Sequence, residues 1–239
     1  MVKKILGVLA VVIVVLVIVV ATRPDTYHVE RSIDVSAPAA VIFPVVADLK
    51  AMGDWSPWDK KDPAMKKTYS DATTGVGASY AWEGNKQVGK GKMTITESRA
   101  PERVADKLEF IEPFPSVAET AMTLKSTGPT STNVTWSMDG KSNFIGKAFS
   151  LVMNMDKAVG PDFEAGLTNL KGIAEAKQAT LVKEAAERAA AAQAAAAAAV
   201  AAAPPPDAKA APDAPKSKKK LGALVRGARR APRRLALRR

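Results

Sequence analysis

The chain has 239 residues, about one and a half times a usual domain length, which predicts one domain with additional segments. It contains no cysteine and one histidine, His28, which excludes disulfide frameworks, thiolate metal sites, cysteine nucleophiles and multi-histidine metal sites. We therefore expect no metal and no cofactor. The formal net charge of +11 would suit nucleic acid or an anionic membrane as a partner.

The excess positive charge lies at the two ends of the chain. Residues 1–22 carry a net charge of +2, from two lysines. Residues 23–176 carry 18 basic and 20 acidic side chains, whereas residues 177–239 carry 15 basic and 4 acidic ones. The middle of the chain is close to neutral, so an electrostatic partner is expected for the C-terminal tail and not for the domain.

An apolar run covers residues 5–22, at the short end of what crosses a bilayer as a helix. Two lysines precede it, so the positive-inside rule places the amino terminus in the cytoplasm and the rest of the chain outside. A cleaved signal peptide is the alternative, with Val19 and Ala21 before the cut. Because the run is longer than a usual signal core, we favour an anchor over residues 1–23. The protein is then single-pass in a bacterial-type inner membrane, with its domain on the extracytoplasmic side.

Beyond this run, the pattern predicts a strand, a short helix and then a strand-rich region. Alternation predicts a half-buried strand over 27–35, followed by a helix over 39–49. The segment Trp55-Ser56-Pro57-Trp58 is expected to be irregular. Further strands are predicted at 68–70, 78–82, 88–97, 104–111, 117–124 and 133–139. Their short proline- and glycine-containing breaks predict antiparallel neighbours, and Gly84, Gly89 and Gly91 predict a bend in the sheet.

A long helix is predicted from Pro161, because Phe163, Leu167, Leu170 and Ala174 recur at helical spacing. Residues 177–203 are expected to extend this helix as a spacer, since 13 of the 15 residues in 189–203 are alanine. Residues 204–239 are predicted to form a proline- and alanine-rich linker and a disordered tail. The tail, residues 216–239, holds 11 basic residues and no acidic one.

This order of elements resembles the polyketide cyclase/dehydrase branch of the START-like (SRPBCC) superfamily. The residues that carry the resemblance are 33–38 (IDVSAP), 55–58 (WSPW) and 161–171 (PDFEAGLTNLK). The resemblance covers about residues 27–176. It implies an α+β helix-grip fold, in which a curved antiparallel sheet wraps around a long C-terminal helix and leaves a cavity between them. It brings no shared catalytic residues, because members bind lipids, sterols, polyketides or hormones and only some are enzymes.

Large apolar side chains on the expected concave face are the candidate ligand-binding residues, because apolar pockets have such walls. They are Trp55, Trp58, Tyr80, Trp82, Met93, Leu108, Phe110, Trp136, Met138 and Phe163. The alternative for each is that it fills the core. Trp55 and Trp58 would either gate the cavity mouth or plug the open end of the sheet.

One carboxylate is a weak candidate for catalysis. Asp106 alternates in phase with Leu108 and Phe110, so its side chain is expected to point inward, where burial would raise its pKa and suit it to acid–base work. The alternatives are a register error or pairing with a lysine. His28 falls in the outward phase, which argues against a catalytic role.

The basic tail has three interpretations: it binds an anionic lipid or polysaccharide surface, it binds nucleic acid, or it only solubilises the chain. Leu221, Leu224 and Val225 lie at helical spacing among arginines, which favours a surface-seeking segment. If the domain and its tail are exported, nucleic acid is a less favoured partner than an anionic surface. If the tail is cytoplasmic, nucleic acid becomes the more favoured partner.

Our leading functional hypothesis is a membrane-anchored module that binds a hydrophobic small molecule or lipid in an internal cavity. Two alternatives stay open. One is an enzyme of the cyclase or dehydrase type. The other is a structural envelope protein whose cavity has collapsed around Trp82, Phe110 and Trp136.

Overall fold

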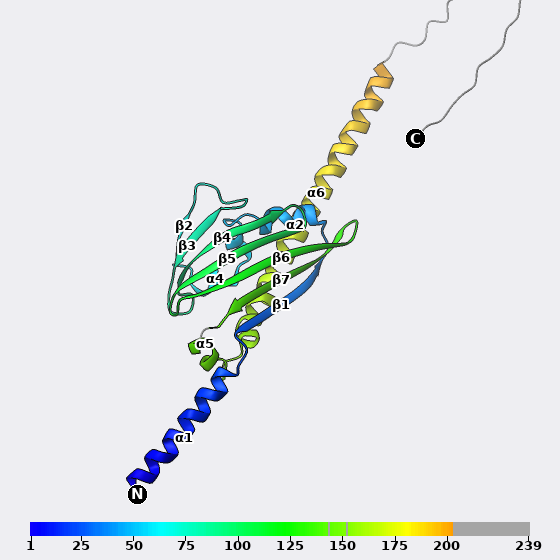
Figure 1. Ribbon diagram of the computed structural model, residues 1–239. Helices are drawn as coiled ribbons and strands as arrows, with labels where there is room; N and C mark the ends of the chain where they lie inside the picture. The colour runs from blue at the N-terminus through cyan, green and yellow to red at the C-terminus, as the bar shows by residue number, and fades with distance from the viewer. Residues whose placement is uncertain (143, 152, 203–239) are drawn as a thin grey trace, which may run out of the picture. The chain divides into compact units, whose positions relative to one another are not determined.

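The computed structural model describes residues 1–202, apart from residues 143 and 152. Its centre is one seven-stranded antiparallel sheet with the order β1-β7-β6-β5-β4-β3-β2 (Figure 1). The strands are β1 (Thr26–Val35), β2 (Lys66–Tyr69), β3 (Ser79–Glu83), β4 (Lys90–Arg99), β5 (Arg103–Glu112), β6 (Ser116–Gly128) and β7 (Ser131–Lys141). Six of these strands are consecutive neighbours, as the short loops predicted, and β1 joins the sheet beside β7.

The helices are α1 (Val2–Ala21), α2 (Ala39–Val46), α3 (Met52–Trp55), α4 (Pro57–Lys61), α5 (Phe144–Phe149) and α6 (Met155–Ala202). In Figure 1, α6 runs along one face of the curved sheet. The predicted apolar stripe of α6 is buried: Phe163, Leu167, Leu170 and Ala174 are each at most 1% exposed. The α+β helix-grip architecture is therefore confirmed.

The core fills only one half of the space between the sheet and α6. On the sheet side, fully buried Ile95, Val104 and Val134 lie on the halves of their strands away from the β5–β6 hairpin. On the helix side, Leu167 and Leu170 come from the middle of α6. Burial of these aliphatic side chains supplies the main stabilising free energy. The other half of the concave face is left for the cavity described below.

Two local predictions are wrong, both at prolines. The Trp55-Ser56-Pro57-Trp58 segment is not irregular: α3 ends at Trp55 and α4 begins at Pro57. Proline suits the first position of a helix, because its φ is already helical and the missing N–H has no intrahelical acceptor there.

The long helix also begins earlier than expected, at Met155, so that Pro161 lies inside it. An internal proline removes one backbone hydrogen bond and disfavours the helix. Here Met155 and Val159 extend the Phe163 stripe backwards at four-residue spacing and pack against the core. Their packing offsets the loss.

Two further features bear on the ends of the chain. Within the described residues, α1 is the one helix long and apolar enough to cross a membrane, and a signal sequence at this position would have the same properties. The linker and basic tail predicted for 204–239 lie outside the described residues.

Candidate ligand-binding cavity

A cavity of about 1230 Å³ lies between the concave face of the sheet and the beginning of α6. Strands β1 and β3 to β7 supply its sheet wall, and residues of α3, α4, α5 and α6 supply the rest of the lining. Pockets for drug-sized ligands usually measure roughly 300–1,000 Å³. The space is therefore large enough for a lipid or a polycyclic molecule.

Nine of the ten predicted ligand-binding residues line this cavity, and the tenth, Trp55, does not. Trp55 is 1% exposed, its Nε1 donates to the Val45 carbonyl oxygen at 3.3 Å, and its ring meets Trp136 edge-on at 5.2 Å. Trp55 thus supports the wall from behind. A purely structural domain was expected to have its cavity filled by Trp82, Phe110 and Trp136. These three residues instead line an open space.

One wall is an aromatic cluster that joins β7 to α6. The rings of Trp136 and Phe163 stack at 4.1 Å with an interplanar angle of 2°, and Trp58 meets Trp136 edge-on at 5.6 Å. Gly166 makes this approach possible, because a Cβ there would lie 2.8 Å from the Trp136 ring. Such pairs add stability beyond their buried area and hold the rings in fixed orientations. This wall is rigid.

The facing wall is a row of aromatic side chains on β3 and β5. Tyr80 and Trp82 lie 5.9 Å apart, and Trp82 meets Phe110 edge-on at 5.8 Å. A Cβ on Gly91 would lie 2.5 Å from the Trp82 ring, so glycine at that position lets the indole lie flat against the sheet. Trp82 Nε1 donates to the Val88 carbonyl oxygen at 3.2 Å, which leaves the indole face turned toward apolar neighbours.

Methionines fill much of the remaining lining. Six of the eight in the chain line the cavity, and sequence reasoning named only two of them, Met93 and Met138. Unbranched thioethers adapt to ligands of irregular shape. Met155 and Val159 were missed because the helix was expected to begin at Pro161. The four-residue spacing back from Phe163 was the signal that would have found them.

Asp106 is the one buried side chain in the described residues with an unpartnered polar atom, its Oδ1. It lies on the concave face between Ile95 of β4 and Thr120 of β6, at the boundary between the filled core and the cavity. Burial raises the pKa of its carboxyl to about 7. The inward phase expected from the sequence is observed, and the side chain is not among those that line the cavity. Asp106 is directly opposite Thr120 and two residues from Leu108, and both of these residues line the cavity.

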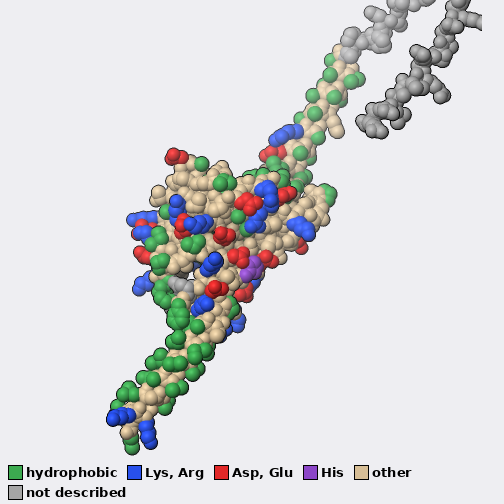
Figure 2. Space-filling model, in the orientation of Figure 1, with side chains coloured by type: hydrophobic (Ala, Val, Ile, Leu, Met, Phe, Trp, Pro, Cys, Tyr) green, Lys and Arg blue, Asp and Glu red, His purple; other side chains and the backbone are tan. Residues whose placement is uncertain are grey.

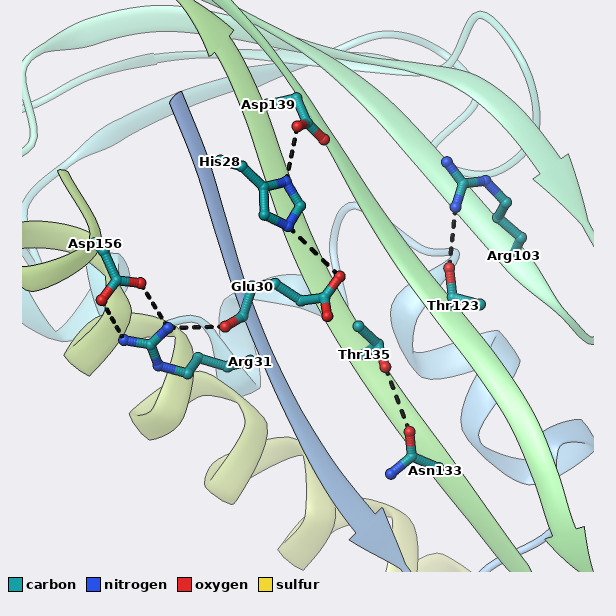
Figure 3. Close-up of polar contacts among 9 residues, drawn as sticks. All are labelled: His28, Glu30, Arg31, Arg103, Thr123, Asn133, Thr135, Asp139 and Asp156. Carbon is teal, nitrogen blue, oxygen red and sulfur yellow. Dashed lines mark hydrogen bonds and ion pairs between the residues drawn. The ribbon is translucent and has the colours of Figure 1, made fainter. Parts of the chain in front are cut away.

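Ion pairs on the outer edge of β1 hold the beginning of α6 in place (Figure 3). Arg31 donates to Asp156 at 2.7 Å and to Glu164 at 2.7 Å, and hydrogen bonding to Arg31 lowers the pKa of Asp156. His28, whose side chain is 54% exposed, lies 2.8 Å from an Asp139 oxygen, and this contact raises the pKa of the imidazole. Within the described residues, no group of three or more potential metal ligands is close enough to hold an ion.

A sequence profile of the family described as "Polyketide cyclase / dehydrase and lipid transport" matches residues 26–175. The chain belongs to this polyketide cyclase/dehydrase family. The match begins at β1 and ends within α6, so it contains every strand and most of the cavity wall. No curated protein sequence matches the chain.

Solved structures with the family fold resemble the chain at low identity. An aromatase/cyclase from a Streptomyces species is 18% identical, covers 63% of this chain and 94% of its own, and has a TM-score of 0.47. Truncated norcoclaurine synthase from Thalictrum flavum is 14% identical, with 62% and 92% covered and a TM-score of 0.48. A major latex-like protein from Panax ginseng is 10% identical, with 62% and 97% covered and a TM-score of 0.46.

Proposed function

We propose that this member of the polyketide cyclase/dehydrase family binds a hydrophobic small molecule or lipid in its cavity. The observation that carries the proposal is an apolar, aromatic- and methionine-lined space of about 1230 Å³ in a chain of this family. An apolar ligand entering such a space loses contact with water over most of its surface, which favours binding. The few polar side chains on the wall, such as Thr120 and Ser56, would set the ligand's orientation.

We further propose that α1 is a retained membrane anchor and that the domain lies outside the inner membrane. Support comes from its 20 residues, its mean hydropathy of 3.2 and the two lysines before its apolar run. A chain held at a membrane has constant access to a hydrophobic ligand. The basic tail, residues 216–239, would then meet a second anionic surface of lipid or polysaccharide.

Photo-cross-linking tests the binding proposal. The full chain in lipid vesicles is incubated with a diazirine-bearing fatty acid, irradiated and mapped by peptide mass spectrometry. We expect adducts on the lining residues of β5 and α6, such as Phe110 and Phe163. The variant Leu108→Trp places an indole in the cavity and should lose these adducts. Leu181→Trp, on the exposed part of α6, is the matched control and should keep them. Adducts that are unaffected by Leu108→Trp would contradict the proposal.

Enzymatic activity is the second candidate, because Asp106 combines burial, an unpartnered oxygen and a pKa near neutrality. A carboxyl with a pKa of about 7 suits proton transfer at neutral pH. Asp106 does not itself line the cavity, so this role requires a bound carbonyl compound to reach past Thr120, its neighbour on β6. We therefore expect the chain to accelerate exchange of the acidic C–H hydrogens of an apolar β-diketone with D₂O. Asp106→Asn should lose that acceleration, and equal rates in both proteins would leave binding as the function.

A further inference from the structure

Most of the exposed residues that line the cavity lie at one end of the domain, which contains the first residues after α1. The exposed residues of the lining gather there: residues 23–28, the tip of the β5–β6 hairpin and the segment from α5 to the beginning of α6. At the opposite end, fully buried Ile95 and Leu167 close the space. This end therefore offers a ligand a route of entry beside the residues that follow α1.

Exposed hydrophobic side chains cluster at this end of the domain, and three of them, Phe114, Ile145 and Met153, also line the cavity. We call them the rim patch: Ile111, Phe114, Val117, Phe144, Ile145 and Met153, which are 48–58% exposed. Three come from the β5–β6 hairpin and three from α5 and the segment after it. The other large exposed hydrophobic residues of the described chain outside α1 are Val76, Leu181, Val182 and Val200. Figure 2 shows hydrophobic side chains exposed around this end of the domain. Such clustering marks an interaction surface, whereas scattered exposed residues do not.

The length of chain between α1 and the domain fixes how far the opening can lie from a membrane that holds α1. The helix ends at Ala21, and Asp25 is already tied to the domain, since its carbonyl oxygen accepts a hydrogen bond from Ser142 N at 2.7 Å. Four residues of chain reach at most about 14 Å. Thr26 then pairs with Lys141 at the edge of the opening. The rim patch is thus held next to the membrane surface.

Charge at the opening is mixed, because Arg23 and Lys141 lie among Asp25 and Glu112. Electrostatic attraction to anionic lipid therefore gives this end of the domain little preference for a membrane. The apolar side chains of the rim patch supply the preference instead, because aromatic and aliphatic residues beside a short anchor partition into the bilayer interface.

We propose that the rim patch inserts into the same bilayer that holds α1, so that the cavity opens directly into the lipid phase. The ligand is then a membrane-resident lipid that enters the cavity without crossing water. This inference rests on the proposed lipid-binding function and on α1 as a retained anchor. It adds the docking surface and the route of entry.

The absence of cysteine allows a direct test with single-cysteine variants of the full chain. Phe114→Cys and Ile145→Cys place a label in the rim patch. Val76→Cys is the matched control, because Val76 is also apolar and exposed. It lies in the loop between β2 and β3, at the end of β3 away from the β5–β6 hairpin. Each variant is labelled with the fluorophore NBD and reconstituted into phosphatidylcholine vesicles with or without doxyl-labelled lipid.

We expect doxyl lipid to quench the two rim labels at least about threefold more than the Val76 label, because only the rim labels reach the interface. Equal quenching at all three positions would overturn the docking proposal. Diazirine fatty-acid cross-linking, performed on the same vesicles, distinguishes failure of the docking proposal from failure of the lipid-binding proposal. Unquenched rim labels with intact cavity adducts refute docking alone, whereas quenched rim labels without cavity adducts refute lipid binding alone.

A variant with two aspartate substitutions in the rim patch tests the route of entry. Ile111→Asp together with Phe144→Asp changes rim-patch residues that do not line the cavity, and it penalises contact with the lipid phase. We expect it to slow the formation of cavity adducts by about tenfold when the fatty acid is supplied in the vesicles. Adduct formation at the wild-type rate would show that ligands reach the cavity through water and would overturn the inference.

Discussion

Asp106 is the residue whose environment conflicts most with its ordinary chemistry. Burial raises the pKa of its carboxyl from 3.8 to about 7, so the folded protein holds a proton there that the unfolded chain has released. Stability from this group is full below the unfolded pKa and is lost as the pH rises from about 4 through about 7. Asp106→Asn removes this dependence. We expect the difference in unfolding free energy between Asp106→Asn and wild type to be about 2–3 kcal/mol more favourable to the variant at about pH 8 than at about pH 5.

Urea denaturation of the full chain at the two pH values, followed by tryptophan fluorescence, measures this gain. Asp71→Asn is the control, since it makes the same chemical change at an exposed position. A constant difference between Asp106→Asn and wild type across the pH range would show that the carboxyl is hydrated or paired in solution. Asp106 would then be unavailable as a neutral-pH acid or base.

The alternation of side chains along strands made most of the cavity wall predictable from sequence. Once Trp82, Leu108 and Trp136 are placed on strands, period-two geometry assigns them to the concave face. Trp55 escaped this logic, because it lies on the short helix α3, whose orientation depends on packing against Val45 and Trp136. The volume left empty was also unpredictable, since it depends on how far α6 stands from the sheet.

At the scale of elements, two glycines of α6 have opposite effects: Gly166 allows a close approach to β7, whereas Gly172 has no close neighbour and only weakens the helix. Both Gly166 and Gly172 lie inside the helix, where alanine is favoured by roughly 0.5–1 kcal/mol. A Cβ at Gly172 meets nothing within 4 Å, so Gly172→Ala should be stabilising by that amount. A Cβ at Gly166 would lie 2.8 Å from the Trp136 ring and 3.2 Å from Pro57. Gly166→Ala should therefore destabilise the protein by about 1–3 kcal/mol.

Thermal unfolding of the two alanine variants gives the comparison, because both make the same chemical change in the same helix. Gly166→Ala should also weaken cross-linking in the cavity, since the ring stack of Trp136 and Phe163 must shift. Stabilisation of both variants by the same amount would show that α6 does not depend on close contact with β7.

The elements that surround the cavity opening were the least predictable from sequence. Helix α5 has only six residues, which is too short for its apolar positions to show a helical period. Pro161 also concealed the first turns of α6, because a proline usually marks a helix start or a break. Local sequence rules work for long periodic elements. They fail where a short segment takes its conformation from the wall on which it packs.

At the scale of the whole molecule, the chain ends in an apolar helix at one terminus and a basic segment at the other. If α1 is a retained anchor, the protein in native membranes keeps residues 1–23. Intact-mass spectrometry of the membrane fraction should then give the full-length mass, and deletion of residues 2–22 should release the protein into the soluble fraction. A mature mass that lacks the first 21 residues would establish a cleaved signal sequence and would also remove the basis for docking at the rim patch.

The basic tail should act at a second surface and should do so through charge. Residues 216–239 carry 11 basic and no acidic side chains, and the helix before them is exposed from residue 189 to 202. Full-length protein in neutral phosphatidylcholine vesicles should therefore capture added phosphatidylglycerol vesicles, whereas a chain that ends at Ala202 should not. Capture should fall steeply above about 0.15 M salt, because screening shortens the reach of exposed charges to roughly 8 Å or less. Capture that persists in the truncated chain would assign the second surface to the domain, and capture insensitive to salt would assign it to the apolar residues of the tail.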